Sequence, residues 1–359
     1  MNWVEHAIVL AVAAGVTLLI TPVARLVGAR WGIVARAGGR HVHTGTVPRI
    51  GGAGMFAGLI AAVAVRWIGE RQWDWQQILT ASDGATLAVL GGIGLVFAIG
   101  LLDDIVDLPP GRKMLGQILA AGLTVAGGVR IEFVGDPFSG GIIMLGVLSI
   151  PITLIWLVSF ANIVNLIDGL DGLAAGVTAI AAVSLFVLAL ESNQPIAAFL
   201  AVAIVGMCIG FLRYNFHPAS VFMGDSGALL LGFSLGCISL TGVMKSTAAI
   251  ALVVPILIVG VPVFDTFSAI IRRKRHGWPI QRADKGHIHH RLLARGFSQR
   301  QTVLIIYVWS AALAVGGYAM RWVPTLYKSL TFLVLAVLSG LMASWLGLFQ
   351  AAHHDDQDS

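Results

Sequence analysis

Charged residues are scarce in this chain of 359 residues. Asp, Glu, Lys and Arg together make up 11% of it, whereas 57% is hydrophobic and the mean hydropathy is +0.87. Soluble globular proteins carry about twice that charged fraction. The shortage of charge therefore excludes an ordinary soluble fold and indicates a polytopic membrane protein.

Cysteines are also few, and two further signals are missing. Cys208 and Cys237 fall in apolar runs, where we expect small buried side chains, and two cysteines give no disulfide framework. The first apolar run lacks a basic n-region and a small-residue cleavage site, so we expect no signal peptide. The sequence has no basic stripe with interleaved aromatic residues, so we expect no nucleic acid partner.

Long apolar runs fill most of the sequence. A membrane-spanning helix needs about 20 mostly apolar residues. The eleven candidate runs are 4–26, 50–68, 84–102, 114–130, 149–166, 172–190, 195–213, 227–243, 247–271, 302–320 and 328–349. We therefore predict one all-α membrane domain over 1–349, kinked at Pro255 and Pro262, and a disordered tail over 350–359.

Two features orient this domain. Short apolar runs flank turn-forming residues in RIEFVGDPFSGGIIML, which predicts a small extracellular β-hairpin around 130–146. With the N-terminus outside, the cytoplasmic loops hold 17 of the 23 Lys and Arg residues. Cytoplasmic loops of membrane proteins are enriched in these residues, so we expect an N-out, C-in orientation with a cytoplasmic tail.

This orientation brings the polar segments to one membrane face. Four of them, LLDDIVDLPPGRK, NIVNLIDGLDG, RYNFHPASVFMGDSG and the basic segment that ends in GHIHHRLL, each follow an odd-numbered run. The aspartates that converge there are Asp103, Asp104, Asp107, Asp168, Asp171 and Asp225. A membrane boundary is a costly place for carboxylates, so each of them is a functional candidate.

The segment DDIVD carries three of these carboxylates. If the preceding helix continues, Asp103 and Asp107 lie one turn apart with Asp104 beside them. Three like charges on one helix face are unfavourable unless a cation neutralises them or their pKa values rise. The alternative, a solvated helix end, fits poorly with adjacent aspartates at a membrane boundary.

The segment NIVNLIDGLDGLA adds a second group of polar side chains. Asp168 and Asp171 share a helical face, which Asn162 and Asn165 extend upstream. Carboxylate and amide oxygens suit Mg²⁺, and carboxylates also accept hydrogen bonds from a uracil or a sugar. A polar loop that only connects two helices is the alternative.

Two later segments complete the pattern. FMGDSG supplies Asp225 at the start of an apolar run, and Phe222 is either a stacking platform for a planar base or an aromatic residue of the membrane interface. In GHIHHRLL, three histidines could bind Zn²⁺, but the surroundings are cationic and no cysteine is near, so phosphate binding fits better. A simple positive-inside anchor is the remaining alternative for this segment.

Further charged residues could serve the same site. Arg49 and Lys113 are candidate cations for a diphosphate, although the loop around Arg49 is equally well explained as a topology signal. Asp265 lies near the inner end of the ninth run and is a functional candidate unless it pairs with Arg272 or Arg273. An acidic floor with a cationic rim is what Mg²⁺-assisted phosphoryl transfer requires, here between a soluble nucleotide donor and a lipid acceptor.

DDIVD, NIVNLIDGLDGLA, FMGDSG and HIHH, in this order, resemble the polyprenyl-phosphate N-acetylhexosamine-1-phosphate transferases. The resemblance runs from about Arg49 to Leu293. It implies transfer of a sugar 1-phosphate, with GlcNAc as the expected sugar, from a UDP-sugar to undecaprenyl phosphate with release of UMP. It also implies Mg²⁺ as cofactor with Mn²⁺ as a substitute, a site on the cytoplasmic face of the bacterial inner membrane, and a homodimer. Such enzymes initiate cell-envelope glycan synthesis.

The resemblance also implies roles for individual residues. Asp103 and Asp104 would be catalytic, with Asp103 as a base toward the lipid phosphate, and Asp225 would bind the metal with Asn165. The implied substrate-binding residues are Arg49, Lys113, Asn162, Asn165, Asp168, Asp171, Phe222, His287, His289, His290 and Arg291. Among these, Phe222 would lie under the uracil, and the histidine segment would contact the sugar-diphosphate.

Two other functions compete with this interpretation. The phospho-N-acetylmuramoyl-pentapeptide transferases are cousins of this family, but ADKGHIHHRLL is nearer to the N-acetylhexosamine branch. A cation-coupled secondary transporter would place its carboxylates near the bilayer midplane, on interrupted helices of two related halves. Here the carboxylates lie at the ends of apolar runs on one side, which favours the enzyme.

Overall fold

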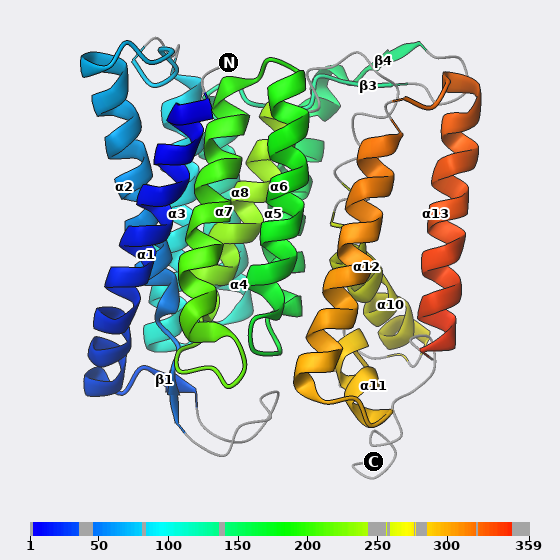
Figure 1. Ribbon diagram of the computed structural model, residues 1–359. Coiled ribbons are helices and arrows are strands. Elements are labelled where there is room, and N and C mark those ends of the chain that lie inside the picture. The colour runs from blue at the N-terminus through cyan, green and yellow to red at the C-terminus, as the bar shows by residue number, and fades with distance from the viewer. Residues whose placement is uncertain are drawn as a thin grey trace.

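The computed structural model describes residues 3–35, 46–80, 84–135, 141–242, 256, 259–275, 277, 286–320 and 322–346. The described chain is mostly helical (Figure 1). Its helices are α1 (Trp3–Trp31), α2 (Gly51–Gln72), α3 (Ala85–Val106), α4 (Pro110–Ala126), α5 (Ser149–Ile167), α6 (Leu173–Glu191), α7 (Pro195–Asn215), α8 (Gly224–Gly242), α10 (Gly260–Arg275), α11 (Ile288–Ala294), α12 (Gln299–Ala319) and α13 (Thr325–Trp345). A short 3₁₀ helix, η1 (Gly146–Leu148), precedes α5.

Many of these helices could cross a membrane. Among the described residues, eight helical segments are long and apolar enough to do so, namely α1, α2, α3, η1 with α5, α6, α7, α8 and α12. They coincide with eight of the eleven predicted runs. The prediction of a polytopic helical protein is therefore confirmed, whereas the count of eleven stays a prediction.

The other three predicted runs differ from this pattern. The run 114–130 falls largely on α4, which has only 17 residues. The last run falls on α13, whose apolar stretch, Leu330–Met342, is shorter than a span. The first part of the ninth run, with the predicted kink at Pro255, lies outside the described residues, and its second part falls on α10. Its second proline, Pro262, is in the first turn of α10, where a proline needs no kink because its position has no intrahelical N–H bond to lose.

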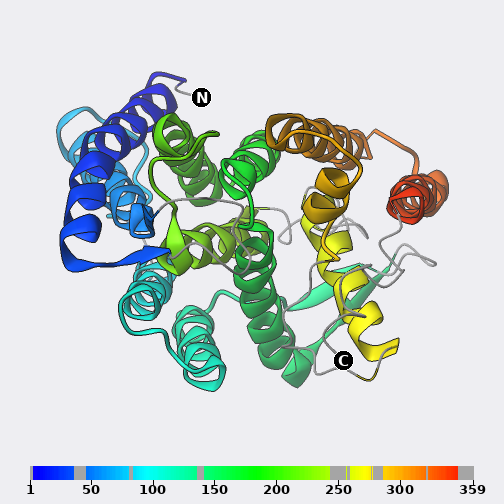
Figure 2. The same cartoon turned by 90° about the horizontal axis from the view of Figure 1, so that it is seen from below.

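Helix α8 lies at the centre of the bundle (Figure 2). All its residues from 226 to 242 are buried, and it packs against α2, α3, α5, α6 and α7. A helix that is apolar on every side is expected to be buried in this way. Small residues permit the close packing: a Cβ on Gly232 would overlap the carbonyl oxygen of Phe160 on α5.

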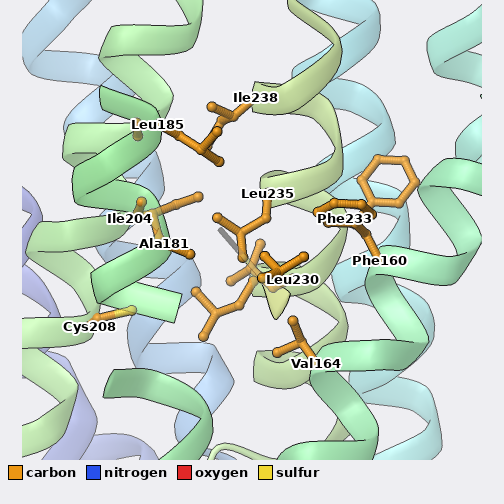
Figure 3. Close-up of a cluster of buried hydrophobic side chains, with 14 of the residues drawn as sticks. Phe160, Val164, Ala181, Leu185, Ile204, Cys208, Leu230, Phe233, Leu235 and Ile238 are labelled. Atoms are coloured by element: carbon orange, nitrogen blue, oxygen red, sulfur yellow. The ribbon is translucent and has the colours of Figure 1, made fainter. Parts of the chain in front are cut away.

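The core around α8 is built from aliphatic and aromatic side chains. Figure 3 shows Leu235 of α8 facing Leu185 of α6 and Ile204 of α7, while Phe233 and Phe160 lie on the side of α5. All of these side chains are buried. This packing fixes α8 rigidly, so the position of its N-terminus at one end of the bundle is well determined.

Two short hairpins mark opposite ends of the molecule (Figure 1). Strands β3 (Phe133–Gly135) and β4 (Ile142–Met144) pair antiparallel, which confirms the predicted hairpin. Strands β1 (Val34–Ala35) and β2 (Val47–Pro48) form a second antiparallel pair that the sequence did not predict, because two-residue strands carry no readable alternation.

The polar segments meet at the end of the bundle that carries β1. There α3, α5 and α7 end, α4, α6 and α8 begin, and α11 lies across the same end (Figure 1). These connections and α11 carry all four motifs, so the polar segments do converge at one end of the bundle.

Candidate functional site

A cavity of about 750 Å³ opens at this end of the bundle. Eleven of the fourteen predicted site residues line it: Arg49, Asp104, Lys113, Asn165, Asp168, Asp171, Phe222, Asp225, His287, His289 and His290. They come from five separate parts of the chain. The cavity is therefore a single polar site assembled by the fold.

A lysine bridges two carboxylates at the floor of the cavity. The Nζ atom of Lys113 lies 2.9 Å from Asp103 Oδ2 and 2.8 Å from Asp225 Oδ1. The other oxygen of Asp103 accepts a hydrogen bond from the backbone N–H of Leu108, at 2.7 Å. Lys113 is in the first turn of α4, which begins at Pro110 just after the end of α3, so it reaches both carboxylates. This place attracts a cation.

Asp104 fixes the N-terminus of α8. Its two carboxylate oxygens accept the backbone N–H groups of Asp225, at 2.8 Å, and Ser226, at 3.0 Å, and its side chain is almost completely buried. Gly224 has a positive φ of 70°, and a Cβ there would overlap both of these oxygens. Asp104 therefore holds Asp225 in place, a role that the sequence did not predict.

Arg49 also lines the cavity and contacts the end of α3. It donates to Asp107 Oδ1 at 2.5 Å and to the carbonyl oxygen of Asp104 at 3.1 Å. Burial disfavours the cation, but Asp107, Asp104 and Asp225 outweigh it and raise the pKa of Arg49 above its usual value. In the part of the chain that the structure describes, its buried Nε has no hydrogen-bond partner.

Asn165 and Asp168 come from the end of α5. The Asn165 side chain interacts with the carboxylate of Asp225. Burial, together with the negative charges of Asp225, Asp104 and Asp171, raises the pKa of Asp168 to about 8. Asp168 is therefore mostly neutral at pH 7 and can ionise when positive charge enters the cavity.

Asp171 and Asn215 tie together the loops that form the cavity wall. Asp171 Oδ2 lies 2.8 Å from His217 Nδ1 and accepts the backbone N–H of Ala219 at 3.0 Å. Asn215 accepts the N–H of Gly172 and donates to the carbonyl oxygen of Val221. The role of Asn215 was not predicted, although an isolated amide at the end of an apolar run, in RYNFHP, was a usable signal.

The histidine segment closes one side of the cavity. His287 Nδ1 lies 2.9 Å from Asp265 Oδ2, so in the described chain Asp265 pairs with His287 rather than with Arg272 or Arg273. A Cβ on Gly169 would lie 2.6 Å from Nε2 of His289, which explains the glycine. Burial, helped by His290 and His287, lowers the pKa of His289 to about 3, so this ring stays neutral.

Comparison with known proteins assigns the chain to a family. Residues 86–243 match the model of glycosyl transferase family 4. A Bacillus subtilis protein named "Probable undecaprenyl-phosphate N-acetylglucosaminyl 1-phosphate transferase" is 35% identical over 92% of this chain and 89% of its own length. The chain belongs to the polyprenyl-phosphate N-acetylhexosamine-1-phosphate transferases.

Two further relatives, one of them from the cousin family of pentapeptide transferases, show how broad the similarity is. The decaprenyl-phosphate N-acetylglucosaminephosphotransferase of Mycolicibacterium smegmatis is 39% identical over 87% of this chain and 81% of its own length. The phospho-N-acetylmuramoyl-pentapeptide-transferase of Desulforudis audaxviator is 34% identical over 86% of this chain and 97% of its own. The protein is therefore a multi-pass membrane enzyme of the transferase class.

Three predicted site residues of this transferase do not line the cavity within the described chain. Asp103 contacts Lys113, which lines the cavity, but does not line it itself. Asn162 donates to Gln117 Oε1 at 2.5 Å and to the Val158 carbonyl at 2.8 Å, so it joins α5 to α4. Arg291 donates from Nε to the carbonyl of Gly286 at 3.2 Å. In the described chain, Asn162 and Arg291 therefore hydrogen-bond to neighbouring protein groups and do not line the cavity.

Phe222 reaches the cavity from a tightly held backbone. Its N–H donates to the Pro48 carbonyl at 2.8 Å, and its own carbonyl accepts the N–H of Gly51 at 2.9 Å. The connection between α7 and α8 is thereby fixed beside β2. Phe222 is half-buried and lines the cavity, so its aromatic side chain is available for the stacking role, which stays a prediction.

Asp225 and Asn165 of the transferase cavity could hold a magnesium ion. The carboxylates of Asp103 and Asp225 already share a cation, and the Asn165 side chain is beside Asp225. Over the described residues, no group of three or more Asp, Glu, His or Cys side chains is arranged to hold a metal by itself. Mg²⁺ usually takes one or two protein carboxylates and completes its shell with water and substrate phosphates, so this donor set suits it.

Proposed function

We propose that the protein transfers N-acetylglucosamine 1-phosphate from UDP-N-acetylglucosamine to undecaprenyl phosphate and releases UMP. The proposal rests on the cation bridge from Asp103 through Lys113 to Asp225 at the floor of the cavity where the four motifs meet. The names of the relatives supply the sugar and the polyprenyl phosphate. The product would be the lipid-linked sugar that starts a cell-envelope glycan.

The reaction joins two anions, and electrostatics is its main difficulty. An oxygen of the lipid phosphate would form a bond to the phosphorus that carries the sugar, and the bond from that phosphorus to the UMP oxygen would break. Bound Mg²⁺ would neutralise phosphate oxygens. Lys113 and Arg49 both line the cavity and would hold the two phosphate groups near one another.

The lipid phosphate is already an anion and a fair nucleophile, so we favour direct attack in one step. Asp103 remains the predicted base, although Lys113 and the Leu108 N–H engage both of its oxygens. With both oxygens held, its most direct contribution is to keep Lys113 in place. The covalent alternative, in which an aspartate carries the sugar phosphate, needs an aspartate with an accessible oxygen.

We place the cavity on the cytoplasmic side of the inner membrane. Under the predicted N-out, C-in orientation, 17 of 23 Lys and Arg residues lie on that side. A water-soluble UDP-sugar would enter from the cytoplasm, and the lipid would present its phosphate from the inner leaflet. The β3–β4 hairpin would then lie on the outer surface.

A donor panel tests the proposal. The purified full-length protein receives undecaprenyl phosphate and either UDP-N-acetylglucosamine, UDP-N-acetylgalactosamine or UDP-N-acetylmuramoyl-pentapeptide, each with Mg²⁺ or with EDTA. We expect UMP release with UDP-N-acetylglucosamine, dependent on both Mg²⁺ and the lipid. Preference for the pentapeptide donor would support the other branch, to which the Desulforudis relative belongs. If no donor released UMP, the proposed transferase activity would be rejected, and the transporter function would be tested next.

Replacing Phe222 with alanine should weaken donor binding. Loss of a base-stacking ring costs about 1–3 kcal/mol, so the Kd for the UDP-sugar should rise about 5–150-fold. Isothermal titration in detergent measures this directly. Phe216→Ala is the matched control, because Phe216 is a partly exposed aromatic at the same end that is not among the described cavity-lining residues. An unchanged donor Kd would favour the interface role for Phe222.

The raised pKa of Asp168 predicts pH-dependent metal binding. Below pH 8 its carboxyl is mostly protonated, and a divalent cation must displace that proton. Mg²⁺ affinity should therefore rise with pH, by up to about tenfold per unit, and level off above about pH 8. Titrations with Mg²⁺ at several pH values measure the slope, and Asp168→Asn should make it shallower. If Mg²⁺ affinity depended on pH equally in Asp168→Asn, the proton displaced by the metal would belong to another group.

A further inference from the structure

Asp265 is a buried carboxylate outside the four motifs. It lies on α10, and its side chain is almost completely inaccessible to solvent. Its Oδ2 lies 2.9 Å from Nδ1 of His287, and its Oδ1 accepts the backbone N–H of Ile288 at 2.9 Å. Each carboxylate oxygen of Asp265 therefore has a partner in the histidine segment, so Asp265 links α10 to this segment.

The surroundings strengthen this contact. A small apolar hollow beside Asp265 is lined by Ile167, Leu173, Val177, Val261, Ile288 and Ile306. A carboxylate in such surroundings is costly unless its oxygens are satisfied. Because both oxygens are engaged by the histidine segment, the carboxylate and the imidazole hold one another in one orientation.

The contact determines which ring nitrogen of His287 serves the cavity. An ionised carboxylate only accepts hydrogen bonds, so Nδ1 must carry the proton that faces Asp265. His287 lines the cavity, and Nε2 is its remaining nitrogen. The His289 ring lies parallel to it, with centroids 5.8 Å apart and an interplanar angle of 5°, and limits rotation from the other side.

We propose that Asp265 is a positioning residue of the transferase: it fixes the tautomer and orientation of His287 so that Nε2 binds the sugar-diphosphate of the donor. The inference rests on the proposed function. Carboxylates that orient functional imidazoles act in this way in other enzymes, and their loss typically costs about 10–100-fold in activity. Asp265 touches no substrate in this scheme and acts only through His287.

Asp265→Asn tests the tautomer. In this variant, the asparagine oxygen can accept the N–H of Ile288 only if its NH₂ group faces His287. Because that NH₂ group donates a hydrogen bond, Nδ1 of His287 must then be an acceptor without a proton. We expect the kcat/KM for the UDP-sugar to fall about 10–100-fold, while the KM for undecaprenyl phosphate and the melting temperature stay close to wild type. A structural defect would impair both substrates and lower the melting temperature. Ser268→Ala is the matched control, since Ser268 donates only to the Asp265 backbone carbonyl, at 2.8 Å.

A double-mutant cycle separates positioning from general damage. In His287→Asn, the amide nitrogen can still reach Asp265, but the position of Nε2 is lost. The single variants should lose similar activity, and the double variant should be within about twofold of His287→Asn alone. Additive losses would overturn the inference. Wild-type kcat/KM in His287→Asn would also overturn it, and this variant can be measured even if Asp265→Asn fails to fold. A wild-type protein that releases no UMP rejects the proposed function, and the inference falls with it.

Discussion

Asp225→Asn is expected to lower turnover by about 10²–10³-fold while leaving the fold intact. The carboxylate of Asp225 lies 2.8 Å from the Lys113 ammonium and beside Asn165, at the place where the cavity attracts a cation. Asparagine keeps the shape and the backbone N–H that Asp104 accepts, but it removes the negative charge. The loss should therefore appear in catalysis and in metal binding rather than in stability.

Two measurements check this result. Initial rates of UMP release at increasing Mg²⁺ give both the turnover and the metal concentration for half-maximal activity, which should rise steeply in the variant. Ser234→Ala serves as the control, because Ser234 is a small polar residue of the same helix, buried nine positions further along α8 and not among the described cavity-lining residues. Unchanged Mg²⁺ affinity in Asp225→Asn would place the metal at other residues.

Asp104→Asn is expected to cost at least about 10²-fold in turnover. Both oxygens of Asp104 accept backbone N–H groups at the start of α8, and an amide would turn its NH₂ group toward one of these donors. Leaving a buried donor unpaired costs about 1–3 kcal/mol, so some stability should be lost as well. The shifted α8 terminus would carry Asp225 away from Lys113.

Asp107→Asn provides the comparison for this variant. Asp107 is in the same DDIVD segment, but its side chain is 81% exposed and its pairing with Arg49 is at the surface. Surface ion pairs contribute about 0–1 kcal/mol, so turnover should change by less than about fivefold. Thermal unfolding together with UMP release measures both effects. Wild-type turnover in Asp104→Asn would remove Asp104 from the catalytic machinery and reduce it to a helix cap.

Much of the fold could be predicted from local patterns. Runs of apolar residues long enough to cross a bilayer predicted eight helices that the structure contains, because hydrophobicity and length are properties of a continuous stretch. The β3–β4 hairpin followed from turn-forming residues between short apolar runs. The four motifs also predicted nine of the residues that line the cavity, since polar residues in an apolar chain are conspicuous, and Arg49 and Lys113 were predicted as cations beside them.

By itself, the sequence determined the class of protein, the helices and the identity of the polar segments. Only the tertiary structure decided how those segments engage one another. Asp104 accepts the backbone N–H of Asp225, 121 positions further along the chain, at the start of α8. Lys113 joins α3 to α8, and Asp265 contacts His287. Helix patterns report on neighbours within a few residues, whereas these contacts exist only because packing around α8 brings distant helix ends together.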